Sequence, residues 1–278
     1  MNQPYKGTPF DLTGRAVLIS GATGLLGTEF ALAAASAGAD LVLGDLDGDK
    51  LKSLENEITA SYPDTRILVR TLDVTCTDSC QSIAQSCENW FGRLDAVIHS
   101  AAIDPKFEKD SDTSRFSKFT EFPLALWQTS LDVNLTGAFQ LAQATCRIME
   151  KSGKGSIVFL GSNYGLVGPD QRIYKKAGQE IQTYKPAVYS VCKAGLLGLT
   201  KFLAAYYMYT SIRINLLTPS GVWNKHDPEF IGSYSSRTIL GRMSEKDEYR
   251  GAIIFLLSDA SSYMTGANLV IDGGWTAL

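Results

Sequence analysis

Residues 20–27 read Ser20-Gly21-Ala22-Thr23-Gly24-Leu25-Leu26-Gly27, between an apolar β-branched run at 16–20 and an alanine-rich helical pattern at 25–37. A glycine-rich turn in this position is typical of sheets that bind dinucleotides. Gly21 can make the tight turn, Gly24 allows the backbone to approach a pyrophosphate, and Gly27 allows the helix to pack on the strand. The helix N-terminus favours the negative charge of phosphates. A glycine turn without a ligand is the alternative, so the interpretation depends on the rest of the chain.

Outward from this turn, short β-branched runs alternate with helical patterns along the chain. The runs that predict strands are 16–20, 41–44, 66–71, 94–99, 156–160, 212–217 and 268–271. The patterns that predict helices are 25–37, 50–62, 78–91, 124–150, 179–209 and 245–258. We therefore expect an α/β fold, a doubly wound Rossmann-type parallel sheet of about seven strands with helices on both faces. The 278 residues fit a single domain spanning 1–278.

The composition is that of an ordinary soluble globular protein, with 45% hydrophobic and 20% charged residues. A net charge of -3 without a basic block argues against nucleic acid as a partner. No apolar run approaches the roughly 20 residues that span a bilayer, so we expect a cytoplasmic protein that does not enter a membrane. The cysteines lack paired C-x-x-C spacing and there are two histidines. We therefore expect no metal site and an acid–base group other than histidine.

Asp45 ends the second predicted strand, about 20 residues beyond the glycine turn, where a carboxylate can accept hydrogen bonds from both ribose hydroxyls. The same carboxylate repels a 2′-phosphate, and no Arg or Lys lies within the glycine turn or just after Asp45. We expect NAD(H) rather than NADP(H), with a loop-capping carboxylate as the alternative for Asp45. Asp73 and Val74 follow the third strand and are candidates to contact adenine. The segment His99-Ser100-Ala101-Ala102 follows the fourth strand and is a candidate to line the adenosine ribose.

Four polar residues are candidates for the chemistry. Tyr189 and Lys193 are four positions apart in a predicted helix, and so lie on one face. A phenol titrates near pH ~10, and a neighbouring ammonium favours the phenolate at lower pH. Ser162 follows the fifth strand, where its hydroxyl can hold a substrate oxygen, and Asn134 is an amide inside a predicted helix. The structural alternatives are a solvated Tyr–Lys pair, a turn serine and a helix-stabilising amide.

Together and in this order, these residues resemble the short-chain dehydrogenase/reductase family, in its short single-domain branch. The resemblance covers almost the whole chain from Asp11 and includes Pro219-Ser220-Gly221 and Asp272-Gly273-Gly274. It implies that Tyr189 is the general acid/base, that Lys193 lowers its pKa and holds the nicotinamide ribose, that Ser162 positions the substrate oxygen, and that Asn134 supports a water relay. The cofactor-binding residues that it implies are Gly21, Thr23, Gly24, Leu25, Leu26, Gly27, Asp45, Asp73, Val74, Ser100, Ala101, Ala102, Tyr189, Lys193, Pro219, Gly221 and Val222. It also implies a homotetramer or homodimer assembled through the two long helices.

Three segments depart from the family pattern. The glycine turn has the G-x-x-G-x-x-G spacing of the longer epimerase-type branch, and Leu25 stands where the short branch usually has its second glycine. His99-Ser100-Ala101-Ala102 stands where the family usually shows Asn-Asn-Ala-Gly, and Ser220 replaces the usual glycine after Pro219. These departures concern the cofactor and leave the Tyr–Lys–Ser set intact.

Three segments, 104–121, 163–187 and 220–242, are candidate substrate loops. Residues 161–171 and 185–189 are similar to flagellin-modification oxidoreductases of bacterial nonulosonic-acid pathways, which implies a sugar-derived substrate. The cations of the segment 169–185 can receive a phosphate or carboxylate on a sugar. They are Arg172, Lys175, Lys176 and Lys185. A solvated basic loop is the alternative.

We therefore expect an NAD-dependent oxidoreductase that transfers hydride between nicotinamide and a secondary alcohol or ketone. Tyr189 is the expected acid/base, and a phosphorylated or nucleotide-linked sugar is a candidate for the small-molecule substrate. One alternative is an NAD-recycling sugar epimerase or dehydratase, which the glycine spacing favours. The length opposes it, because that branch normally carries a sizeable C-terminal substrate domain. A second alternative is a non-catalytic NAD-binding protein, which has no need of an activated phenol.

Overall fold

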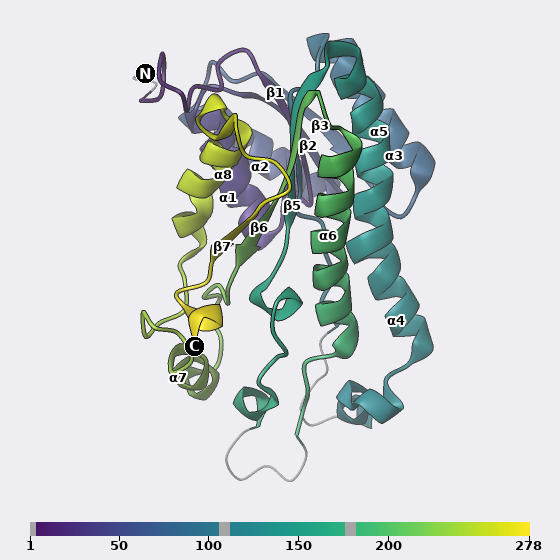
Figure 1. Ribbon diagram of the computed structural model, residues 1–278, viewed down its shortest axis with the longest axis vertical. Coiled ribbons are helices and arrows are strands. Elements are labelled where there is room, and N and C mark those ends of the chain that lie inside the picture. The colour runs from purple at the N-terminus through teal and green to yellow at the C-terminus, as the bar shows by residue number, and fades with distance from the viewer. Residues whose placement is uncertain (1–3, 106–111, 176–181) are drawn as a thin grey trace.

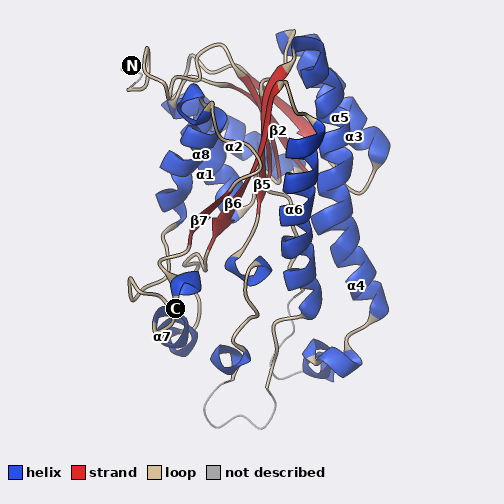
Figure 2. Ribbon diagram, viewed as in Figure 1, coloured by secondary structure: helices blue, strands red, loops and turns tan. Residues whose placement is uncertain are grey.

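The computed structural model describes residues 4–105, 112–175 and 182–278. These residues form one sheet of seven strands in the order β3-β2-β1-β4-β5-β6-β7. The strands are β1 (Ala16–Ser20), β2 (Asp40–Asp45), β3 (Ile67–Thr71), β4 (Ala96–His99), β5 (Lys154–Leu160), β6 (Ser211–Pro219) and β7 (Asn268–Ile271). Every neighbouring pair is parallel. Helices flank the sheet on both faces (Figure 2), so the predicted doubly wound α/β fold is confirmed.

The α-helices of the described residues are α1 (Leu25–Ser36), α2 (Gly48–Ser61), α3 (Thr77–Phe91), α4 (Leu124–Leu131), α5 (Gly137–Ser152), α6 (Ala187–Tyr206), α7 (Pro228–Ser235) and α8 (Arg250–Leu257). Most of them form two layers, one on each face of the sheet, and α7 and the start of α4 lie at the carboxyl end of the strands. Figure 1 shows α1, α2 and α8 on one face and α3, α5 and α6 on the other.

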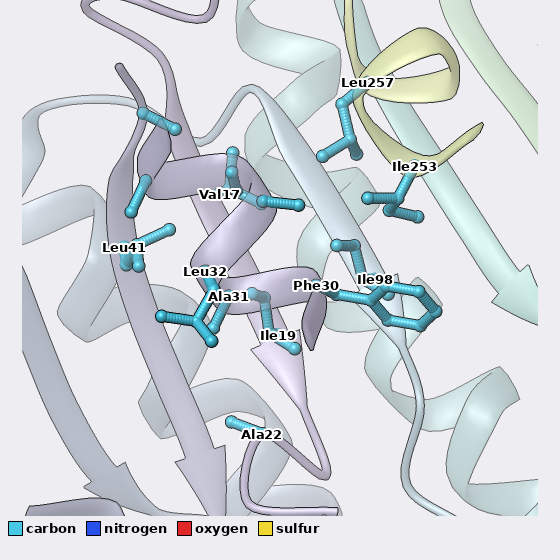
Figure 3. Packing of buried hydrophobic residues seen from close by; sticks show 14 of the residues in the cluster. Val17, Ile19, Ala22, Phe30, Ala31, Leu32, Leu41, Ile98, Ile253 and Leu257 are labelled. Atoms are coloured by element: carbon cyan, nitrogen blue, oxygen red, sulfur yellow. The ribbon is translucent and has the colours of Figure 1, made fainter. Parts of the chain in front are cut away.

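The central strand β1 shows why the core is two-sided. All five of its residues are buried. Val17 and Ile19 pack in one cluster with Phe30 of α1 and Ile253 of α8 (Figure 3). Leu18 belongs instead to the cluster on the opposite face, with residues of α3 and α5. Successive side chains of a strand point to opposite faces, so a strand covered on both sides is apolar at every core position.

Some predicted helices have different bounds in the structure. The pattern at 179–209 gives a described helix only from Ala187, because Pro186 precedes it with φ -64° and ψ 143°, and a proline disfavours helical backbone in the residue before it. Residues 179–181 lie outside the described residues. The single helix predicted at 124–150 is divided into α4 and α5 by a π-helical turn, Asp132–Thr136.

Helix α7 lies inside 220–242, where the sequence predicts only a loop. The Asp227 side chain accepts a hydrogen bond from the backbone N–H of Glu229, and Pro228 occupies the first helical turn. Both features are ordinary helix-start signals. The eight residues of this helix are too few for a strong periodic pattern, which is why its existence was not predicted.

The strands of a parallel sheet end at one edge, and ligand sites form there where the strand order reverses. The reversal falls between β1 and β4. The described parts of the segments after β4, β5 and β6 lie at the same end of the molecule, together with α7 and the start of α4 (Figure 1). The described parts of the three predicted substrate loops therefore lie together at the carboxyl edge.

Candidate active site

Two glycines of the turn after β1 cannot be replaced by a larger residue, each for its own steric reason. Gly21 has φ +65°, and a Cβ on it would lie 2.6 Å from the Cα of Ala101. A Cβ on Gly27 would lie 2.0 Å from the carbonyl oxygen of Gly21. Since real Cβ atoms do not approach backbone so closely, the turn, the start of α1 and the segment after β4 require glycine at both positions.

Gly24 caps the N-terminus of α1 without a side chain, and a Cβ there would meet only the Gly21 carbonyl oxygen, at 3.2 Å. The first N–H groups of a helix attract anions, and an N-cap without a side chain leaves room for one. This part of the chain therefore fits the pyrophosphate of a dinucleotide.

Asp45 lies beside the glycine turn. Its Oδ2 accepts a hydrogen bond from the Thr23 N–H at 3.0 Å, and its Oδ1 accepts one from the Leu46 N–H at 2.7 Å. The structure thus places the Asp45 carboxylate next to the glycine turn, where the sequence predicts it. Because it also bonds the loop that follows it, the loop-capping alternative holds for the Leu46 contact.

Other predicted cofactor residues follow β3, β4 and β6, at the carboxyl edge of the sheet. Asp73 Oδ1 accepts hydrogen bonds from the backbone N–H and the hydroxyl of Thr75, and the Val74 side chain is buried. Ser100 donates its backbone N–H to the carbonyl oxygen of Ser20 at 3.1 Å, which sets the segment 100–102 against the end of β1. Pro219 ends β6, and Gly221 and Val222 follow in the next turn.

Tyr189 and Lys193 lie one turn apart on α6, with Ser162 beside them at the end of β5. The Ser162 hydroxyl donates to Oδ1 of Asn163 at 3.1 Å and is near enough to the Tyr189 phenol to lower the pKa of that phenol. The buried ammonium of Lys193 donates to the carbonyl oxygen of Leu160 at 2.7 Å and lies 5.8 Å from the centroid of the Tyr189 ring. Three of the four predicted chemical residues are thus in one place.

Burial shifts the pKa of both titratable groups in the direction of the neutral form, and Lys193 still carries its charge at neutral pH. Burial raises the pKa of Tyr189 to about 12, against the opposing effect of the nearby Ser162. Burial lowers the pKa of Lys193 to about 8. The sequence predicts that Lys193 lowers the pKa of this phenol, but in the structure the pKa lies above its ordinary value, because desolvation by burial is the largest effect on it.

Asn134 lies in the π-helical turn and is buried. Its Oδ1 accepts from the backbone N–H of Ile103 at 2.7 Å, and its Nδ2 donates to the Ile103 carbonyl oxygen at 2.8 Å. A π-helical turn inside a helix is frequent at functional sites, because the extra residue changes where a side chain points. Here it aims the amide at the segment after β4, which the sequence did not indicate.

Two cations of the segment 169–185 are in ion pairs. Arg172 binds Asp170 through two nitrogen–oxygen contacts, at 2.8 and 2.9 Å. The Nζ of Lys185 lies 2.5 Å from Oδ2 of Asp104 and 3.9 Å from the centroid of the Tyr189 ring. Lys176 lies outside the described residues. The hypothesis of a basic segment open to a phosphate therefore does not fit Arg172 or Lys185.

The site also includes Tyr234 of α7, which sequence reasoning missed. Its hydroxyl accepts hydrogen bonds from the Gly221 N–H at 2.6 Å and from Nδ2 of Asn163 at 3.1 Å. An isolated tyrosine in a predicted loop carries no signal of such a role. The residue joins the turn after β5 to the turn after β6.

A cavity of about 990 Å³ lies beside this group, between the start of α4, the turn after β5 and the first half of α6. Its walls include Phe119, Leu124, Trp127, Leu166, Tyr184 and Lys185. Tyr189, Ser162 and Lys193 do not line it, so it adjoins the reacting groups through Lys185.

A family model described as "Enoyl-(Acyl carrier protein) reductase" matches residues 21–276. The chain belongs to the short-chain dehydrogenase/reductase family. It is therefore an oxidoreductase that acts on CH–OH groups, and it binds a nicotinamide cofactor and a small-molecule substrate.

Among its relatives, the D-threitol dehydrogenase of Mycolicibacterium smegmatis is 29% identical, over 96% of this chain and 95% of that protein. The trans-4-hydroxycyclohexanecarboxylate dehydrogenase of Sinomonas cyclohexanicum is 32% identical, over 95% and 93%. The L-rhamnose 1-dehydrogenase (NAD(P)(+)) of Azotobacter vinelandii is 30% identical, over 95% and 97%.

Two solved structures are similar over almost the whole chain. The short chain dehydrogenase of Leptospira borgpetersenii with bound NAD+ is 31% identical, with a TM-score of 0.81 over 96% of this chain and 95% of that one. The gluconate 5-dehydrogenase of Burkholderia cenocepacia, in complex with NADP and tartrate, is 27% identical, with a TM-score of 0.81 over 97% and 98%.

Proposed function

We propose that this protein is an NAD-dependent dehydrogenase of a secondary alcohol on a sugar or sugar derivative, with Tyr189 as the general acid/base. The observation that supports it most is the gathering of Lys193 and Ser162 around Tyr189: the Lys193 ammonium lies 5.8 Å from the centroid of the Tyr189 ring, and Ser162 is near enough to lower the pKa of the phenol. Ser162 follows β5, whereas Tyr189 and Lys193 lie on α6, so only the tertiary fold brings the three residues together.

In alcohol oxidation, the substrate hydroxyl lies between Ser162 and Tyr189. Ser162 donates a hydrogen bond to the substrate oxygen, and the Tyr189 phenolate accepts the hydroxyl proton as the carbon–oxygen bond becomes double. In ketone reduction, the phenol returns that proton to the oxygen. Lys193 stabilises the phenolate by its positive charge, and Asn134 holds the segment that closes this side of the site.

The geometry of the glycine turn indicates which residues hold the cofactor. The N-terminus of α1 at Gly24 holds the pyrophosphate, and Asp45 accepts hydrogen bonds from the ribose hydroxyls. When bound, the oxidised nicotinamide supplies the hydride acceptor. We favour NAD over NADP because the Asp45 carboxylate repels a 2′-phosphate, although the two similar structures hold NAD+ and NADP respectively.

A sugar-derived substrate is supported by the names of two relatives, which act on threitol and rhamnose. We also propose a cytoplasmic homodimer or homotetramer. Leu126, Phe139, Phe202 and Tyr206, from α4, α5 and α6, are exposed apolar side chains that a second copy would cover. Among the described helices, α6 alone is long and apolar enough to cross a membrane, a weak signal that an exposed interface helix also gives.

The test is NADH formation with threitol, rhamnose and their relatives, in the wild type and in Tyr189→Phe. We expect the substitution to lower kcat about a hundredfold or more, because the proton acceptor is lost, while NADH binding stays within about twofold. Tyr209→Phe, at a fully exposed tyrosine, is the matched control. A fully active Tyr189→Phe enzyme would exclude the proposed role. Turnover without net NADH would favour the epimerase or dehydratase alternative.

A further inference from the structure

Asp104 and Lys185 are 81 residues apart in the chain, yet their side chains form an ion pair beside the reacting tyrosine. The Lys185 ammonium lies over the Tyr189 ring, 3.9 Å from its centroid. The Asp104 carboxylate is close enough that its charge raises the pKa of the Tyr189 phenol, and the Lys185 charge lowers the pKa of Lys193. One small molecule bound at Tyr189 therefore also reaches the ion pair.

Each member of the pair is held in place by a side-chain amide. Gln171 accepts from the backbone N–H of Lys185 at 2.9 Å and donates to its carbonyl oxygen at 3.1 Å. Asn134 makes the same two contacts with Ile103, the residue before Asp104. These amide contacts fix the backbone next to Asp104 and at Lys185, so the two side chains are held in position to form the ion pair. Preorganised polar groups of this kind are what a binding site needs.

The charges decide which ligand fits. An anion on the Lys185 ammonium would lie next to the Asp104 carboxylate, and a cation on Asp104 would lie next to Lys185, so both are opposed by a like charge. A hydroxyl group donates one hydrogen bond and accepts others. It can donate to Asp104 and accept from Lys185 at once, which satisfies both charged groups. Lys185 is 13% exposed in its side chain and Asp104 39%, so the pair is partly accessible.

We propose that Asp104 and Lys185 bind a second hydroxyl, next to the carbon that is oxidised, and so select polyols and sugars over simple alcohols and hydroxy acids. This inference rests on the proposed function, because it needs the reacting hydroxyl at Tyr189. In this proposal a hydroxyl takes the place of the phosphate or carboxylate that the cations of the segment 169–185 suggest by themselves.

The experiment compares three alcohols that share one ring: cyclohexane-1,2-diol, cyclohexanol and 2-hydroxycyclohexanecarboxylate. We expect the wild type to show a kcat/KM for the diol at least about tenfold above that for cyclohexanol, with the hydroxy acid lowest. Lys185→Met keeps the length of the side chain and removes the donor, so the preference for the diol falls toward unity. The readout is the ratio of kcat/KM for the diol to kcat/KM for cyclohexanol, because an effect of the lost Lys185 charge on Tyr189 and Lys193 changes both alcohols alike and leaves the ratio unchanged.

Asp104→Asn gives a second, opposite result. It leaves the Lys185 ammonium without a carboxylate, so we expect kcat/KM for the hydroxy acid to rise while that for the diol falls. Arg172→Gln is the matched control, since it removes a cation of the same segment that is paired with Asp170. The control keeps the wild-type order of the three substrates. NADH binding by each variant shows that it is folded.

Equal kcat/KM for diol and cyclohexanol in the wild type would overturn this inference and leave the proposed function standing. So would a preference for the hydroxy acid, or a Lys185→Met variant that binds NADH and keeps the full diol preference. A wild type that oxidises threitol but none of the three ring alcohols would overturn this inference alone, whereas NADH binding without oxidation of threitol, rhamnose or the ring alcohols would overturn the proposed function and this inference together.

Discussion

The hydroxyl of Tyr234 lies 2.6 Å from the backbone nitrogen of Gly221, and a Cβ on Gly221 would come within 2.4 Å of Cζ of the same ring. The tyrosine also accepts from Asn163, the residue after Ser162. Through this buried hydroxyl, α7 holds together the turn that carries a predicted catalytic residue and the turn that carries predicted cofactor residues.

Tyr234→Phe is expected to lower the free energy of unfolding by about 1–3 kcal/mol, because the buried Asn163 amide and the partly buried Gly221 N–H lose their acceptor. The KM of the substrate rises as well, since the turn at Ser162 is less well fixed. Denaturant unfolding and initial rates measure both effects. Tyr263→Phe, at a fully exposed tyrosine, is the control and stays at the wild-type values. An unchanged unfolding midpoint for Tyr234→Phe would contradict the role given to its hydroxyl.

Gly27→Ala and Gly24→Ala separate the two functions of the glycine turn. Gly27→Ala forces a Cβ against the Gly21 carbonyl oxygen and is expected to lower the free energy of unfolding by about 1–3 kcal/mol. Gly24→Ala has a contact of 3.2 Å, so we expect a smaller loss of stability but weaker NADH binding, because the methyl group occupies the space before α1. Gly48→Ala, at a helical glycine with open space, is expected to be neutral or stabilising. Denaturant midpoints and NADH fluorescence report the two properties separately.

The stability of the protein is expected to fall at acid pH because of His99. Burial lowers the pKa of this histidine from its ordinary 6.5 to about 3. Its Nδ1 lies 2.9 Å from the Ser20 hydroxyl. The unfolded chain therefore binds the proton more tightly than the folded one. The histidine's full contribution is present above pH 6.5 and is lost as pH falls toward 3, about 2 kcal/mol of it by pH 5.

His99→Asn removes this titration, and a shorter polar group still faces Ser20. The difference in free energy of unfolding between pH 8 and pH 5 is expected to shrink in this variant and to remain in His226→Asn, the other histidine of the chain. Urea unfolding at the two pH values is the measurement. Equal acid sensitivity in the wild type and His99→Asn would show that other groups account for it.

Asp45→Asn is expected to reduce the preference for NADH over NADPH about tenfold or more, because the carboxylate that repels a 2′-phosphate is gone. The amide keeps an acceptor for the Thr23 N–H. The ratio of the two dissociation constants, measured by fluorescence titration, needs no substrate. Asp49→Asn, on the exposed first turn of α2, is the control. Tighter binding of NADPH than of NADH by the wild type would refute the assignment of NAD.

Local patterns in the chain were enough to predict the sheet and its order of elements. A strand covered on both faces must be apolar throughout, and an amphipathic helix buries one stripe, so β1, β5 and α3 are evident from the residues themselves. The glycines at 21 and 27 follow from a steric requirement of one short turn. The positions of Tyr189 and Lys193 follow from helical periodicity, since residues four apart share a face.

The contacts between loops and the electrostatics of the site depend on the tertiary structure. Asp104 meets Lys185, and Tyr234 meets Asn163, only because the segments after β4, β5 and β6 leave the sheet at one edge, and irregular segments have no period that marks their partners. Even the direction of the Tyr189 pKa followed burial rather than its lysine neighbour. Burial is a property of the whole fold, because many distant residues together exclude water from one hydroxyl.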